Sequence, residues 1–147
     1  MDARKRYRDL ATHALAGFQL VEASLKQYIG YYYDAVSALV DDRLSFSYSH
    51  SDIDEAALEK LLGIFSKVNG NKEFIKELRA LINIRNEVAH RAFVDLYKPA
   101  QKTPDFEPKS DELIQIAEKL GAILAQMSEE TTKVKSVLSM ARKSKPE

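Results

Sequence analysis

The sequence predicts an all-α fold: one domain, spanning residues 1–147, built as an up-and-down antiparallel bundle of four main helices. Apolar residues recur at three- and four-residue spacing over long stretches, which is the helical period. The alternation typical of strands occurs only in the short, serine-rich segment 44–48. A chain of 147 residues is long enough for one hydrophobic core and too short for two.

The first helix is expected from about Asp2 to Asp42. Glycine inside a helix costs about 1 kcal/mol relative to alanine, so Gly17 and Gly30 weaken this helix and Gly30 is a position where it could kink. The apolar positions nevertheless keep the helical period throughout: Tyr7, Ala11, Ala14, Phe18, Val21, Leu25, Ile29, Tyr32, Val36, Leu39 and Val40.

A polar loop over Ser45–Ser51 follows, and Asp52 or Asp54 is expected to cap a short second helix. This helix should end at Asn69-Gly70-Asn71, because these residue types are typical of a helix C-terminus. Its apolar face consists of Leu58, Leu61, Leu62, Phe65 and Val68.

The third helix is expected from about Lys72 to Tyr97, followed by an extended loop with Pro99, Pro104 and Pro108. Ser110 is expected to cap the fourth helix. Residues 143–147 should form a frayed tail. The apolar face of the fourth helix comprises Leu113, Ile116, Ala117, Leu120, Ile123, Leu124, Met127, Val134 and Leu138.

The amino-acid composition limits the classes of function that this protein can have. Twenty-two basic residues balance 22 acidic ones, so the chain has no general attraction to nucleic acid, and a protein that coats RNA or DNA is excluded. The absence of cysteine excludes disulfides and cysteine-ligated zinc. The N-terminus lacks the apolar core of a signal peptide, and no apolar run of about 18 residues is present. We therefore expect a cytoplasmic protein without a membrane span.

Other candidate sites are weaker. His13 and His50 have no metal-ligand neighbours at useful spacing, so no metal or other cofactor is expected. The tyrosines between positions 28 and 33 circle the helix rather than lining one face, which argues against a base-stacking platform. Tyr32 and Tyr33 are expected in the core, which leaves Tyr28 and Tyr31 to pack on another element, such as a dimer partner. The basic C-terminal end, with Lys133, Lys135, Arg142, Lys143 and Lys145, is typical of a solvated helix end, though it could also steer RNA.

Arg85 stands where the third helix calls for an apolar residue. A buried guanidinium is costly unless it is paired. Glu22 interrupts the apolar face of the first helix in the same way, so we expect the two to pair across the bundle. The alternative is that Glu22 lies at the edge of its face and reaches solvent. The apolar neighbours of Arg85 are Phe74, Leu78, Leu81, Ile82, Val88, Ala89, Ala92, Phe93 and Leu96.

Asn86 and His90 follow Arg85 as an i, i+4 pair. The resulting R-N-x-x-x-H pattern, on the penultimate helix of a small helical chain, resembles the signature of the HEPN superfamily. The resemblance covers nearly the whole chain in helix order and rests on these three residues in identity. It implies a compact and commonly dimeric helical bundle. Many such domains are metal-independent ribonucleases of toxin–antitoxin or other defence systems, and others are binding modules.

The resemblance makes Arg85, Asn86 and His90 the candidate catalytic residues. Histidine titrates near neutrality and would act as general acid or base. Arginine would stabilise the phosphate or organise the site, and asparagine would orient the imidazole or a ligand. A homodimer would bring two such sets into one cleft. One departure concerns the toxins paired with nucleotidyltransferase antitoxins, which often carry a tyrosine two residues after the histidine. Here that position is Ala92.

We therefore expect a metal-independent endoribonuclease whose partners are a second copy of the chain, RNA or a nucleotide, and an antitoxin or defence protein. A first alternative is a binding module of the same fold without catalysis, which would recognise a nucleotide, RNA or a protein. A second is a purely structural dimerising protein, in which the three residues form a buried polar network. The exposure of His90 distinguishes these hypotheses: the ribonuclease and the binding module require His90 to be accessible to solvent, and the structural protein requires it to be buried.

Overall fold

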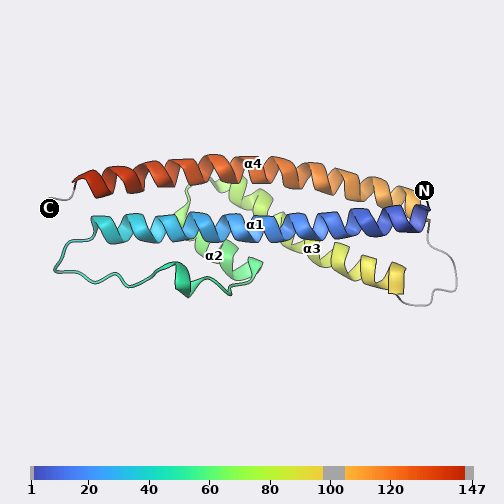
Figure 1. Ribbon diagram of the computed structural model, residues 1–147, viewed down its shortest axis with the longest axis horizontal. Helices are drawn as coiled ribbons and strands as arrows, with labels where there is room; N and C mark the ends of the chain where they lie inside the picture. Colours follow the sequence, from blue (N-terminus) through green and yellow to red (C-terminus); the bar gives the residue numbers. More distant parts are fainter. Residues whose placement is uncertain (1, 98–104, 145–147) are drawn as a thin grey trace.

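The computed structural model describes residues 2–97 and 105–144, and within these ranges the chain is all-α, without strands (Figure 1). The expected fold class is therefore confirmed at this level. A single turn of 3₁₀ helix, η1, lies in the long connection after the first helix. The elements in chain order are α1 (Ala3–Leu39), η1 (His50–Asp52), α2 (Leu58–Val68), α3 (Lys72–Tyr97) and α4 (Phe106–Ser144).

The two longest helices, α1 and α4, lie side by side and run in the same direction (Figure 1). Near the start of both, the rings of Tyr7 and Phe106 are 5.2 Å apart. Near the other end, the Lys135 ammonium lies 5.1 Å from the centre of the Tyr31 ring. The contacting residue numbers rise together, so the pair is parallel. The expected up-and-down antiparallel order is therefore wrong for these two helices.

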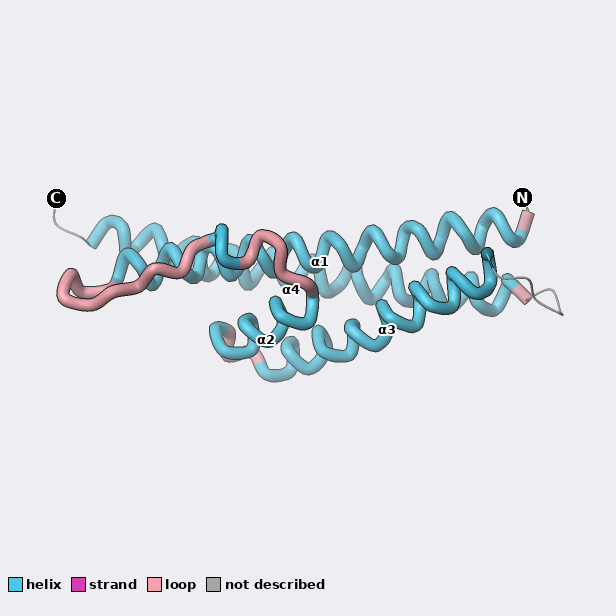
Figure 2. Tube along the Cα trace, turned by 90° about the horizontal axis from the view of Figure 1, so that it is seen from below, coloured by secondary structure: helices cyan, strands magenta, loops and turns pink. Residues whose placement is uncertain are grey.

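The physical reason is the segment between α1 and α2, which returns along α1 without forming a long helix (Figure 2). The Phe46 ring packs edge-on against Tyr33, with centroids 5.9 Å apart. Further along the segment, Lys26 donates a hydrogen bond of 2.7 Å to the carbonyl of Asp54. This irregular stretch takes the place of one helix of an up-and-down bundle, so α2 runs in the direction of α1, α3 runs opposite to it, and α4 again runs with α1.

Helix α3 runs opposite to α1 and ends beside its first turn. The Arg4 guanidinium donates to the Leu96 carbonyl at 2.6 Å, and the Tyr7 hydroxyl donates to Asp95 at 3.0 Å. The core lies where α2 and α3 cover one side of the α1–α4 pair. Its largest fully buried side chains come from all four helices and include Phe18, Leu25, Ile29, Leu61, Phe65, Phe74, Leu78, Leu81 and Met127.

The start of α2 differs from the expectation. Asp52 does not cap this helix, because it accepts a hydrogen bond from the backbone of Ser49, the N-cap residue of η1. Asp54 is instead paired with His50. The helix begins four residues later, at Leu58, behind an N-cap residue without a side-chain hydrogen bond. Both aspartates therefore stabilise the returning segment rather than the helix that follows it.

Helix α4 also begins earlier than expected, at Phe106 rather than after Ser110. Asp105 accepts a hydrogen bond of 3.3 Å from the backbone N–H of Glu107, as an N-cap residue does. Pro108 lies in the first turn, where backbone N–H groups have no acceptor within the helix, so no hydrogen bond is lost. Ser110 is therefore inside the helix, and it is 1% exposed.

Three smaller expectations concern glycine, proline and the tail. Helix α1 stays helical through Gly30. Helix α4 extends to Ser144, so the first two residues of the expected tail are helical. The expected loop residues Pro99 and Pro104, and the last three residues 145–147, lie outside the described parts of the chain.

Candidate functional site

Arg85 occupies the inward row of α3, but its side chain turns to the edge of the core. It is 25% exposed, so the expectation of a fully buried guanidinium is wrong. The long side chain reaches Glu22 on α1, and its charged end remains partly hydrated there. The other members of the row are buried: Leu78, Leu81, Val88, Ala92 and Leu96.

The expected ion pair between Glu22 and Arg85 is present. Nη1 of the guanidinium lies 3.3 Å from Oε1 of Glu22, whose side chain is 26% exposed. The other side of the guanidinium contacts Asn86, whose amide oxygen accepts from Nε at 3.4 Å and from Nη2 at 3.2 Å. Arg85 is thus held between an acid on α1 and the amide of the next residue on its own helix.

His90 lies on the outer face of α3. It is exposed, and it makes no hydrogen bond or ion pair with the part of the chain that the structure describes. The same face continues with Phe93 and Tyr97, which are 54% and 71% exposed and whose ring centroids are 6.1 Å apart. Ala89 is exposed as well. The sequence prediction that Ala89 and Phe93 belong to the core is therefore wrong.

Within one chain, Arg85 and His90 are presented to different sides of α3. Residues five apart on a helix are separated by about 140° around its axis. Arg85 accordingly reaches Glu22 on α1, whereas His90 faces outward. A reaction that needs the guanidinium and the imidazole at one phosphate would therefore need the two residues to come from two copies of the chain.

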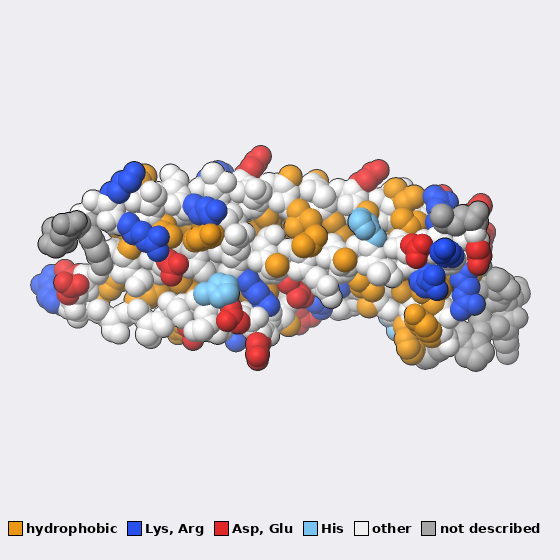
Figure 3. Space-filling view, in the orientation of Figure 1, with side chains coloured by type: hydrophobic (Ala, Val, Ile, Leu, Met, Phe, Trp, Pro, Cys, Tyr) orange, Lys and Arg blue, Asp and Glu red, His pale blue; other side chains and the backbone are white. Residues whose placement is uncertain are grey.

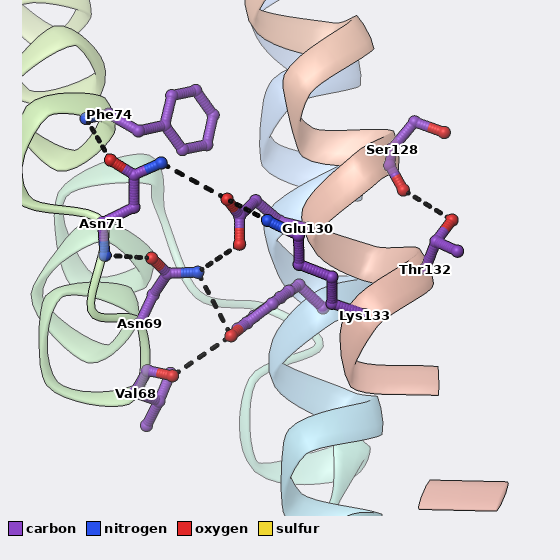
Figure 4. Close-up of polar contacts among 9 residues, drawn as sticks. Val68, Asn69, Asn71, Phe74, Ser128, Glu130, Thr132 and Lys133 are labelled. Atoms are coloured by element: carbon purple, nitrogen blue, oxygen red, sulfur yellow. Dashed lines mark hydrogen bonds and ion pairs between the residues drawn. The ribbon is translucent and has the colours of Figure 1, made fainter. Parts of the chain in front are cut away.

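A second polar cluster, which the sequence analysis missed, joins α4 to the turn between α2 and α3 (Figure 4). Its centre is Glu130, which is 7% exposed. One carboxylate oxygen accepts from the amide of Asn69 at 3.0 Å, and the other accepts from the amide of Asn71 at 3.4 Å. Lys133 lies 3.7 Å from the same acid. We call this the Glu130 cluster.

Tyr28 completes the Glu130 cluster. Its hydroxyl accepts from the amide of Asn69 at 3.2 Å and donates to the carbonyl of Val68 at 3.1 Å. Its ring packs on Phe65 with centroids 4.9 Å apart, and burial raises the pKa of the phenol above its usual value. Tyr28 therefore packs on another element, as expected, but that element is α2 of the same chain and not a dimer partner. Tyr31, expected to be left over with it, is partly buried.

A third cluster lies at the start of α1. Asp95 accepts a hydrogen bond from Tyr7 at 3.0 Å and pairs with Lys109 at 2.7 Å. Burial, and then the hydrogen bond to Asp95, raise the pKa of Tyr7 to about 12. This cluster ties the beginning of α1 and α4 to the end of α3.

Searches for other kinds of site give no candidate in the described residues. No group of three or more histidine, aspartate or glutamate residues there could hold a metal ion. No helix in the described ranges is long and apolar enough to cross a membrane.

Comparison of the chain with protein-family models, with curated proteins and with solved structures found no match. Any functional assignment must therefore come from the geometry of the site around Arg85 and His90, together with the sequence resemblance described above.

Proposed function

We propose that the protein is a HEPN-like, metal-independent endoribonuclease of a defence or toxin–antitoxin system, with a composite active site in a homodimer cleft. The observation that carries the proposal is the arrangement on α3. Arg85 is held by Glu22 at 3.3 Å and by Asn86, while His90, one turn beyond Asn86, is open to solvent. A fixed cation and an accessible imidazole, brought together from two copies of the chain, are the minimum equipment for cleaving RNA without a metal.

The reaction needs few protein groups because RNA supplies its own nucleophile. The 2′-hydroxyl loses a proton and attacks the adjacent phosphorus, and the bond to the 5′-oxygen breaks. The products are a 2′,3′-cyclic phosphate and a 5′-hydroxyl. His90 would deliver the proton that the departing 5′-oxygen takes up, or remove the proton of the 2′-hydroxyl.

Arg85 can serve as both organiser and phosphate ligand. A guanidinium has five N–H groups, and those at Nε, Nη1 and Nη2 that contact Asn86 and Glu22 account for three of them. The remaining two could donate to phosphate oxygens, where charge accumulates in the transition state. The ion pair with Glu22 limits the freedom of the arginine side chain and so prepares it for that contact.

The composite site follows from the divergence of Arg85 and His90. Two copies that meet along α3 would place the imidazole of one chain near the guanidinium of the other. The exposed side chains of Ala89 and Phe93 on that helix face are suited to a contact between copies.

A binding module without catalysis is the second candidate. It is favoured by the balance of 22 basic and 22 acidic residues, which gives an enzyme acting on RNA little overall attraction for its substrate. The purely structural reading is less well supported, because a buried polar network requires a buried His90 and this residue is exposed.

The test is cleavage of a mixed RNA pool in EDTA by the purified protein, beside the His90→Ala variant. The proposal expects 2′,3′-cyclic phosphate ends, no action on DNA or 2′-O-methyl RNA, and a loss of about 10²–10⁴-fold in rate for His90→Ala. His13→Ala is the matched control and should cleave at the wild-type rate. No cleavage, or equal cleavage by wild type and His90→Ala, would favour the binding module.

A further inference from the structure

A groove with basic walls lies at the end of the molecule where α1 begins. Its volume is about 320 Å³. Figure 3 shows lysine and arginine side chains gathered at this end of the molecule. We call it the N-terminal groove, and its lining residues are Asp2, Arg4, Lys5, Arg8, Leu96 and Tyr97.

The charges of the N-terminal groove are arranged unfavourably for the isolated chain. Arg4 and Lys5 lie in the first turn of α1, which contains no acidic residue. Cations at this end of a helix oppose its dipole, and Arg4 and Arg8 are like charges at i, i+4 spacing. Asp9 is 3.9 Å from Arg8, and the described part of the chain offers Lys5 no acidic partner. A bound anion would relieve this repulsion.

The groove also has an aromatic wall. Tyr97 is 71% exposed, and its ring lies beside that of Phe93. Tyr97 follows His90 by seven residues, about two turns of α3 or about 10 Å along the helix axis. Exposed tyrosine rings next to a basic groove are typical of surfaces that bind single-stranded nucleic acid, because every base has a face that can stack.

We propose that the N-terminal groove binds the part of a single-stranded RNA that flanks the nucleotide held at His90. Tyr97 would stack on one base, and Lys5 and Arg8 would contact the phosphate attached to it. The choice of RNA rests on the function proposed above. The groove would also explain how a chain of zero formal charge holds a polyanion, since it concentrates cations at one end of the molecule.

Binding is tested separately from cleavage with a single-stranded 2′-O-methyl oligonucleotide, which lacks the nucleophile. Fluorescence anisotropy compares wild type, Lys5→Ala/Arg8→Ala and Tyr97→Ala at several salt concentrations. The double variant should weaken binding by about 10-fold and make the salt dependence shallower, by roughly 0.7 in the logarithmic slope for each lost phosphate contact. Tyr97→Ala should weaken binding by about 5-fold or more, with little change in the slope.

The matched control removes two exposed cations of α2, which do not line the groove, in Lys60→Ala/Lys67→Ala, and should bind like wild type. Melting curves verify that all variants are folded. Absence of binding by wild type, or an equal loss of affinity in the control, would overturn the proposal that the groove binds RNA. Binding that needs the groove, without cleavage of ordinary RNA, would retain the groove and reject the ribonuclease. Cleavage by wild type that the groove variants leave unchanged would retain the ribonuclease and reject the groove.

Discussion

The Glu130 cluster and the pair formed by Glu22 and Arg85 are both polar contacts between helices, but they differ in how complete they are. Glu130 is 7% exposed, and both of its oxygens accept hydrogen bonds. Glu22 and Arg85 are about a quarter exposed, and the guanidinium has N–H groups beyond those that contact Glu22 and Asn86. In the closed Glu130 cluster the carboxylate oxygens are already satisfied within the fold, whereas at the open site the guanidinium of Arg85 has further N–H groups that a ligand could accept from. This difference supports the proposed role of Arg85 in ligand binding and indicates a structural role for Glu130.

The largest expected effect tests the closed cluster. Glu130→Ala should lower the free energy of unfolding by about 3–5 kcal/mol, because it removes two hydrogen bonds to a buried charged acceptor, one from each of the partly buried amides of Asn69 and Asn71. Urea denaturation gives the value. Glu129→Ala, which removes the exposed acid next to it, is the control and should change stability by less than about 0.5 kcal/mol. Similar stabilities of the two variants would show that Glu130 is as dispensable as a surface residue.

An intermediate effect is expected at Tyr7, which belongs to another closed cluster. Its pKa is raised to about 12, so the folded state keeps the phenol proton more tightly than the unfolded state, whose pKa is near 10. The stabilisation is complete below about pH 10 and is lost as the pH rises toward about 12, a change of roughly 2–3 kcal/mol. Urea denaturation at about pH 9 and about pH 11.5 measures this.

Tyr7→Phe is the control for that measurement, because it keeps the ring and removes the titrating group. All other titratable groups are present in both proteins, so only the difference between them reports on Tyr7. Parallel pH profiles for wild type and Tyr7→Phe would contradict a raised pKa.

The smallest effects on stability belong to the open site. Arg85→Ala should cost about 1 kcal/mol, since a pair that is a quarter exposed is screened by solvent. His90→Ala should cost less than about 0.5 kcal/mol, because the side chain is on the surface. Urea denaturation of both variants, beside Arg79→Ala on an exposed position of α3, tests the order. A loss at Arg85 as large as at Glu130 would remove the distinction between the two regions.

Most of the helices could be predicted because their apolar period is long and regular. The observed bounds of α3, Lys72–Tyr97, match the expectation, and α2 ends immediately before Asn69 as expected. Helix starts were less predictable. Asp52 and Ser110 are both good N-cap residues, and each has a different role in the fold. A capping preference is local, so tertiary contacts can assign the residue elsewhere.

The direction of α4 could not be predicted from periodicity, which carries no information about how the chain reverses. It depends on the segment between α1 and α2 packing back along α1, through contacts such as that between Tyr33 and Phe46. Such contacts join residues that no helical pattern relates to each other.

For the site, a charged residue in an apolar row was the useful signal, and it correctly led to the Glu22–Arg85 pair. The same signal was present at Glu130, which lies between Met127 and Val134 in the apolar row of α4. Its partners Asn69 and Asn71 could not be found in that way, because they lie in a turn and their hydrogen bonds depend on where the turn meets α4.

The parallel α1–α4 pair has a hydrodynamic consequence. A helix of 39 residues such as α4 is about 58 Å long, whereas a compact sphere of 147 residues is roughly 40 Å across. A single rod-shaped chain therefore diffuses more slowly than a sphere of the same mass, and in size-exclusion chromatography it elutes early, as a larger globular protein would. The mass from light scattering, rather than the elution volume, is the measurement that counts copies in the proposed dimer.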